Sequence, residues 1–201
     1  MTSDIVYLVD ANVLIEAKNR YYSFSICPGF WDTLVWHAGS GSVRSVDVVK
    51  TELAGGNDDL AEWVKHTAPG NAFCSTNDAN AVAWYGRIMK WVLAEPRFTP
   101  AAKDEFAKSA DPWLVAYAGA LGMTLVTQET PAPMSRNNVK IPDVCRQFGV
   151  PWQNTFEMLW RRWAWPSPGA RRRRDLGRRG SFDAMTCQPP STSTAWWLSS
   201  H

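Results

Sequence analysis

The sequence predicts an α/β fold in which a central parallel sheet is flanked by helices on both faces. The run IVYLV at 5–9 is short, apolar and rich in β-branched residues, as expected of a strand that is buried on both faces, and further strands are predicted at 43–46 and 123–129. Longer segments with helical spacing separate these strands. Strands that alternate with helices indicate parallel strands joined by helical crossovers.

The first strand and helix lie in DIVYLVDANVLIE, residues 4–16. Asn12 can cap a helix whose apolar residues face inward. Asp10 then follows the carboxyl end of the strand, where open α/β sheets place their ligand crevice. Taken alone, Asp10 can equally be a turn or capping residue, so its role depends on whether other carboxylates converge on the same place.

The next elements are delimited by proline and glycine. Pro28 begins a helix that ends in the glycine-containing stretch 39–41, and the strand at 43–46 follows. A short helix then starts at Asp47 and ends before Gly55.

The second half continues the alternation. Trp84, Ile88, Trp91 and Val92 recur at helical spacing, which favours a core or dimer face over a base-stacking platform. We predict a helix at 58–66, a strand within 71–76, helical segments at 78–95 and 100–122, the strand at 123–129, and helices at 141–149 and 154–162.

The periodic pattern ends after Leu159, which divides the chain into two parts. Residues 1–159 carry a net charge of −4 and suffice for one well-buried domain, whereas residues 160–201 carry +6, with eight arginines. This Arg-, Trp-, Pro- and Ser-rich composition predicts a disordered tail. The tail is either a basic arm that binds nucleic-acid phosphates or the product of a slipped reading frame near residue 160, and we prefer the second explanation.

The cysteines and histidines exclude several classes of site. Four cysteines and three histidines are scattered without a C-x-x-C pair, which argues against a zinc site and a disulfide framework. The sequence shows no secretory signal and no apolar run near the roughly 20 residues that span a bilayer. We therefore expect a soluble, cytoplasmic protein without a membrane partner.

Three further acids depart from simple local patterns. Glu52 follows Val48 and Val49 by four and three residues, so a helix would place it on their inward face, unless the helix rotates to expose it. Asp111 precedes a proline, as at an ordinary helix start. Glu129 lies at the carboxyl end of the strand at 123–129, and it can otherwise be a solvated loop residue.

The motifs around these acids resemble those of PIN-domain nucleases. YLVDANVLIEA resembles the opening motif of that family, and KTELAGG resembles its second acidic motif. SADPWLVAYAGALGMTLVTQE is similar to the third acidic position, its helix, and the following strand with a final acid. The resemblance covers roughly residues 4–150 and implies a PIN-like three-layer sandwich. Glu129 departs from the pattern because Asp is commoner there.

This resemblance implies a metal-dependent endoribonuclease. Asp10, Glu52 and Asp111 would bind Mg²⁺ or Mn²⁺, and Glu129 would complete the site directly or through water. Thr127 and Asn12 would position these ligands or a phosphate. Many bacterial members are toxins of VapBC-type pairs, so the expected partners are RNA, a small antitoxin protein and a second copy of the chain.

Two other functions are alternatives. A PIN-like binding module without activity would retain the fold. A haloacid dehalogenase-like phosphatase would use Asp10 as its nucleophile, but it needs a second Asp where this chain has Asn12. Asp143 is a rival fourth ligand, although its place at a helix start favours capping.

Overall fold

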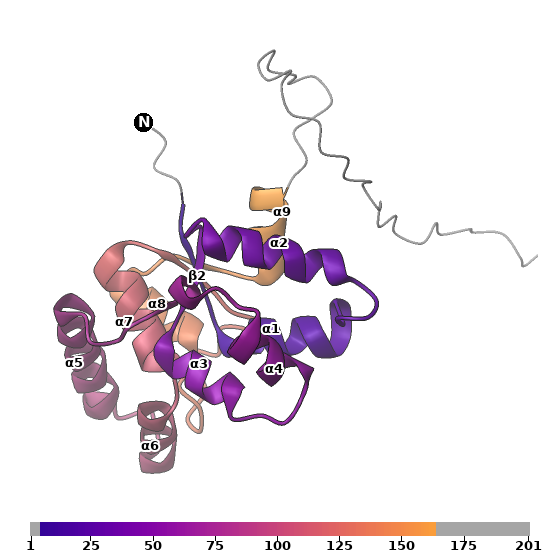
Figure 1. Cartoon of the computed structure of the whole chain (residues 1–201). Coiled ribbons are helices and arrows are strands. Elements are labelled where there is room, and N and C mark those ends of the chain that lie inside the picture. The colour runs from indigo at the N-terminus through magenta and orange to yellow at the C-terminus, as the bar shows by residue number, and fades with distance from the viewer. Residues whose placement is uncertain (1–4, 164–201) are drawn as a thin grey trace, which may run out of the picture. The chain divides into compact units, whose positions relative to one another are not determined.

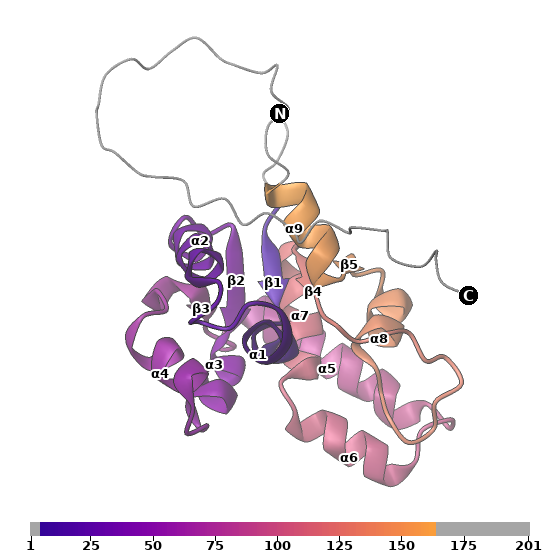
Figure 2. The same cartoon turned by 90° about the vertical axis from the view of Figure 1, so that its right-hand side faces the viewer.

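The computed structural model describes residues 5–163 (Figure 1), which contain a parallel five-stranded sheet whose strands are labelled in Figure 2. The strand order is β3-β2-β1-β4-β5, and every neighbouring pair is parallel. The strands are β1 (Tyr7–Val9), β2 (Val43–Val46), β3 (Phe73–Cys74), β4 (Thr124–Val126) and β5 (Trp152–Gln153). The predicted central parallel sheet is therefore confirmed.

Helices cover both faces of this sheet. Figures 1 and 2 show α5 and α7 on one side of the strands and α1 and α2 on the other, so the predicted flanking layers are confirmed. The helices are α1 (Ala11–Glu16), the π-helix η1 (Ala17–Tyr21), α2 (Pro28–Gly39), α3 (Asp47–Ala54), α4 (Asp59–His66), the 3-10 helix η2 (Gly70–Ala72), α5 (Ala79–Ala94), α6 (Pro100–Lys108), α7 (Asp111–Leu121), α8 (Ile141–Phe148) and α9 (Thr155–Trp163).

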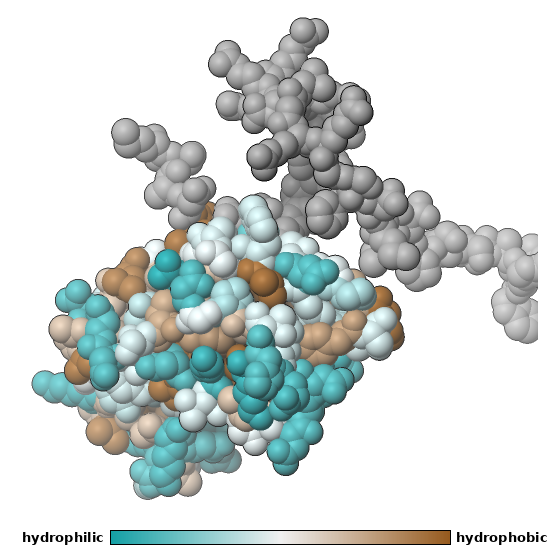
Figure 3. All heavy atoms as spheres, in the orientation of Figure 1, coloured by the Kyte–Doolittle hydropathy of each residue, from teal (hydrophilic) through white to brown (hydrophobic). Residues whose placement is uncertain are grey.

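The core lies between the sheet and these helices. Leu8, Val46 and Leu125, from the three central strands, are completely buried, as are Leu114 of α7 and Ile88 of α5. Burial of such side chains contributes about 1.5–3 kcal/mol each, so the three central strands are held firmly in place. On the outside, Figure 3 shows hydrophobic residues in separate spots among hydrophilic ones on the displayed face.

Several predicted boundaries differ from the observed ones. β1 begins at Tyr7 rather than at Ile5, which is 48% exposed. The segment 100–122 forms two helices, α6 and α7, and the two-residue strand β5 was not predicted. Within the described residues, no helix has the length and apolar character needed to cross a bilayer.

The boundary placed after Leu159 falls inside a helix. α9 continues through Trp163, and Trp160 on this helix is 78% exposed. The rest of the predicted tail, residues 164–201, lies outside the described residues. The proposed division at 159 therefore stays a prediction.

Candidate active site

Asp10 and Thr127 lie side by side at the carboxyl edge of the sheet. Val9 of β1 stands opposite Val126 of β4, so the next residue of each strand continues the pairing. The backbone amide of Asp10 donates to the carbonyl of Val126 at 3.0 Å. In the sheet, β2 lies on one side of β1 and β4 lies on the other. The carboxyl ends of β1 and β4 therefore mark the switch point of the sheet, where open α/β folds bind ligands.

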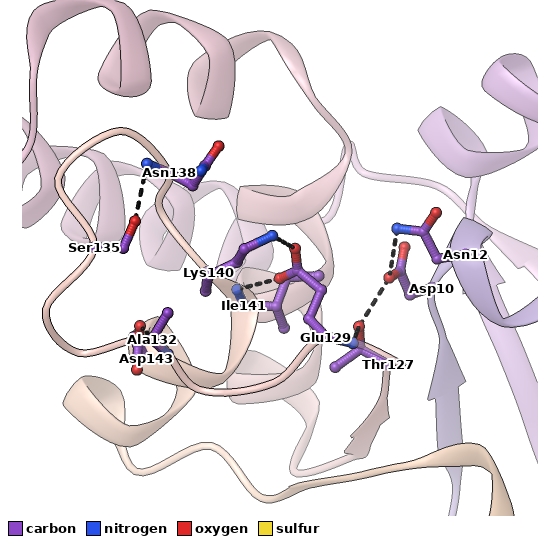
Figure 4. A network of polar contacts seen from close by, with 10 residues as sticks. All are labelled: Asp10, Asn12, Thr127, Glu129, Ala132, Ser135, Asn138, Lys140, Ile141 and Asp143. Carbon is purple, nitrogen blue, oxygen red and sulfur yellow. Dashed lines mark hydrogen bonds and ion pairs between the residues drawn. The ribbon is translucent and has the colours of Figure 1, made fainter.

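Asp10 is a buried carboxylate with few hydrogen-bond donors. It is 2% exposed, and its Oδ2 accepts a hydrogen bond from the Thr127 hydroxyl at 2.9 Å. The Asn12 amide lies 3.5 Å from the same oxygen (Figure 4). Burial raises the pKa of Asp10 to about 6, although bonds from Thr127 and the Asn12 backbone oppose the rise; the charges of Glu129 and Glu52 add to it.

The predicted capping role of Asn12 is wrong. Asp10 occupies the N-cap position of α1 without making a side-chain capping bond, and Asn12 lies inside the first turn. The strand ends one residue before the helix begins, which leaves no linker in which Asn12 could cap. The Asn12 amide instead lies 3.5 Å from Asp10 Oδ2, and the supporting role of Asn12 stays a prediction.

Asp111 is the second acid with a strongly raised pKa. It is the first residue of α7, and its backbone amide donates to the Ser109 hydroxyl at 3.2 Å. The pKa of Asp111 is raised to about 7, mainly by burial and then by the charges of Asp10 and Glu129; a hydrogen bond with Ser109 opposes this rise, and Glu52 adds a smaller one. Asp111 therefore lies within the electrostatic field of the other three predicted acids.

Glu52 is exposed, so the prediction that it faces inward is wrong. α3 buries Val49 and Leu53, which lie four residues apart on one face, and this rotation leaves Glu52 at the surface. Glu52 and Ser109 line an open groove of about 460 Å³. Partial loss of hydration raises the pKa of Glu52.

Glu129 follows Thr127 in the loop after β4 and is held by the start of α8. Its Oε1 accepts from the Lys140 ammonium at 2.6 Å, and its Oε2 accepts from the backbone amide of Ile141 at 2.8 Å (Figure 4). Glu129, Asp111 and Lys140 line a pocket of about 100 Å³. The hydrogen bond from Lys140 to Glu129 raises the pKa of Lys140, so the ammonium stays charged at neutral pH.

Asp143, the rival fourth ligand, has a different partner. It is 8% exposed, and its Oδ2 accepts from the backbone amide of Ala132 at 3.1 Å. Figure 4 shows Asp143 beside Ala132 and apart from Asp10. Asp143 therefore attaches the loop between β4 and α8 to that helix and does not join the other acids.

Comparison with known proteins gives the family of the chain. A family model described as "Domain of unknown function (DUF4411)" matches residues 7–165. The chain belongs to the DUF4411 family. No curated protein matches this DUF4411 chain, and the likeness of its motifs to PIN-domain nucleases stays a prediction from sequence.

Two solved structures are similar to the DUF4411 chain. One is a chain of VapBC2 from Rickettsia felis, crystallised bound to a DNA fragment from their promoter, with 14% identity and a TM-score of 0.46 over 75% of this chain and 98% of that chain. The other is a chain of FitAcB from Neisseria gonorrhoeae, with 15% identity and a TM-score of 0.45 over 75% of this chain and 99% of that chain.

The acids of the DUF4411 chain suit a cation that keeps part of its water shell. Among residues 5–163, no group of three Asp, Glu, His or Cys side chains is placed to hold a metal ion together. Mg²⁺ commonly uses one or two carboxylates and completes its coordination with water and substrate phosphate. Asp10 and Asp111 fit this requirement, because the first is a buried and the second a half-buried carboxyl group, and both have raised pKa values that a divalent cation would oppose by stabilising the ionised form.

Two polar residues near these acids were missed by sequence reasoning. Ser109 lines both the groove that contains Glu52 and the pocket that contains Asp111. Lys140 occupies the N-cap position of α8, where the positive end of the helix dipole disfavours a cation. That conflict could have indicated an acidic partner for Lys140, but not which acid.

Proposed function

We propose that this DUF4411 protein is a metal-dependent endoribonuclease that hydrolyses RNA phosphodiester bonds with Mg²⁺ or Mn²⁺. The observation that carries the proposal is the pair of Asp10, buried at the switch point of the sheet, and the half-buried Asp111 at the start of α7, whose charges interact and whose pKa values are raised to about 6 and 7. Buried carboxyl groups with displaced pKa values are typical of functional sites and costly elsewhere. The motif resemblance supports the same function.

Each acid has a distinct proposed role. Asp10 and Asp111 bind the ion directly, Thr127 and Asn12 orient Asp10, and Glu52 acts through water from the adjacent groove. A divalent ion held by these residues would polarise the scissile phosphate and lower the pKa of an attacking water. The positions of Asp10 and Asp111 at element ends let their carboxylates meet a phosphate without displacing the core.

We further propose that the protein is the toxin of a bacterial toxin–antitoxin pair. The support is the likeness of its motifs to those of VapBC-type toxins. The expected partners are RNA and a small antitoxin protein, in the cytoplasm. Expression of the chain should stop bacterial growth, whereas the Asp111→Asn variant should not, and coexpression of a small neighbouring open reading frame should restore growth.

The nuclease is tested with the full-length chain and labelled single-stranded RNA. Wild type should cleave in Mg²⁺ or Mn²⁺ and stop in EDTA, and Asp10→Asn and Asp111→Asn should reduce cleavage to background. Asp143→Asn is the matched control, because it alters another buried carboxylate that faces Ala132 instead. Cleavage that persists in excess EDTA or in both site variants would reject the proposal.

Metal binding gives an independent measurement. At a free Mn²⁺ concentration of 100 times Kd, binding stabilises the native state by about 2.7 kcal/mol, which corresponds to roughly 5–11 °C in a domain of this size. Wild type should show this rise in Tm, and Asp111→Asn should not. A catalytically inactive binding module would show RNA binding without cleavage at any metal concentration.

A further inference from the structure

The ion pair between Glu129 and Lys140 differs from an ordinary surface pair. The side chains of Glu129 and Lys140 are only 15% and 33% exposed, and Glu129 Oε1 lies 2.6 Å from Lys140 Nζ. The Lys65–Glu62 pair on α4 is 3.3 Å long, with side chains 37% and 65% exposed. The Glu129–Lys140 pair is therefore shorter and less exposed than the Lys65–Glu62 pair, chiefly because Glu129 is covered.

The carboxylate of Glu129 is already bonded on both oxygens. Oε1 binds Lys140, and Oε2 accepts from the amide of Ile141, one of the unpaired donors at the start of α8. These bonds compensate for the cation at the helix N-terminus. Glu129 thus fixes the position of the Lys140 ammonium.

Lys140 brings positive charge to an acidic pocket. The side chains that line the pocket of about 100 Å³ include Glu105, Asp111, Glu129 and Lys140, so Lys140 is the basic residue of this lining. Three carboxylates repel an incoming phosphate, whereas an ammonium attracts it. The bond to Glu129 uses one of three N–H donors on Lys140.

We propose that Lys140 binds a phosphate group of single-stranded RNA in this pocket, and that Glu129 is a positioning residue for Lys140 rather than a direct metal ligand. The inference rests on the proposed nuclease function, because it assigns the phosphate contact of the same site. The ammonium binds a non-bridging phosphate oxygen beside Asp111, while Glu129 and Ile141 keep the lysine at the pocket wall.

The test measures RNA binding without metal. Fluorescence anisotropy with a labelled single-stranded RNA, in EDTA and across a NaCl series, gives the slope of log K against log salt concentration. Loss of one phosphate contact should reduce this slope by about 0.7 in Lys140→Met. Lys140→Arg, which keeps the charge, and Lys65→Met, which breaks the exposed control pair, should keep the wild-type slope.

A second measurement separates phosphate binding from a structural role. Calorimetric titration with Mn²⁺ in the absence of RNA should give Lys140→Met an affinity no weaker than that of wild type, because Asp10 and Asp111 are intact. An unchanged salt slope in Lys140→Met would overturn the inference. A several-fold loss of Mn²⁺ affinity would also overturn it, since Lys140 would then act through the metal site.

These measurements distinguish failure of the Lys140 proposal from failure of the nuclease proposal. If wild type binds RNA but does not cleave it in Mn²⁺, the nuclease proposal fails and the salt slope still reports on Lys140. If wild type does not bind RNA in any condition, both proposals fail. Circular dichroism of Lys140→Met should match wild type, and Lys140→Arg provides a second folded variant for the same comparison.

Discussion

Replacing Asp111 with Asn should stabilise the metal-free protein, and the gain should grow with pH. The pKa of Asp111 is about 7 in the folded state, against an ordinary value of 3.8. At 1.36 kcal/mol per pH unit, this gap of about three units corresponds to roughly 4 kcal/mol when the group is ionised. Because the folded pKa is the higher one, this cost is absent below about pH 3.8, grows between pH 3.8 and 7, and is complete above pH 7.

Urea unfolding in EDTA at pH 5, 6.5 and 8 measures this effect. The Asn side chain keeps the shape of Asp111 without its charge. The free energy of unfolding of Asp111→Asn should therefore exceed that of wild type by about 2 kcal/mol at pH 5 and about 4 kcal/mol at pH 8. Asp32→Asn, which changes an exposed acid on α2, should follow wild type at every pH. A difference in unfolding free energy between Asp111→Asn and wild type that stays constant from pH 5 to pH 8 would refute the reasoning.

Two further substitutions probe the site and the packing behind it. Thr127→Val removes the hydroxyl that lowers the pKa of Asp10, so the acidic limb of the Mn²⁺-dependent cleavage–pH profile should move to higher pH, whereas Thr127→Ser should keep it in place. Gly119→Ala on α7 would place a Cβ 2.5 Å from the ring of Trp84, so thermal unfolding should show a loss of about 1–3 kcal/mol. Gly86→Ala, on α5 with no atom within 4 Å of the new Cβ, should instead gain up to about 1 kcal/mol.

The sheet and the position of Asp10 could be predicted because both depend on local sequence. A strand buried on both faces needs a continuous apolar run, and such runs precede Asp10 and Thr127. Parallel pairing then places the carboxyl ends of β1 and β4 at the same edge. The closeness of Asp10 to Thr127 follows from these two facts, whereas the hydrogen bond between them could be identified only from the structure.

The orientation of Glu52 could not be predicted because α3 has only eight residues. Val48, Val49 and Leu53 allow more than one inward face on so short a helix. In the structure α3 packs against α4, β2, β3 and α1, its buried residues are Val49 and Leu53, and Glu52 lies at the surface. β5 was missed for a related reason, since two residues are too few to show a period.

The pairing of Glu129 with Lys140 depends on a loop whose path the sequence does not reveal. Each residue alone is unfavourable: Lys140 opposes the dipole of α8, and Glu129 adds negative charge near Asp10 and Asp111. Their bond relieves both conflicts and leaves a fixed ammonium in a pocket whose other ionisable residues are all acidic. Removing Lys140 therefore takes away the basic side chain of this lining and leaves the carboxyl groups of Glu105, Asp111 and Glu129 beside any phosphate that enters.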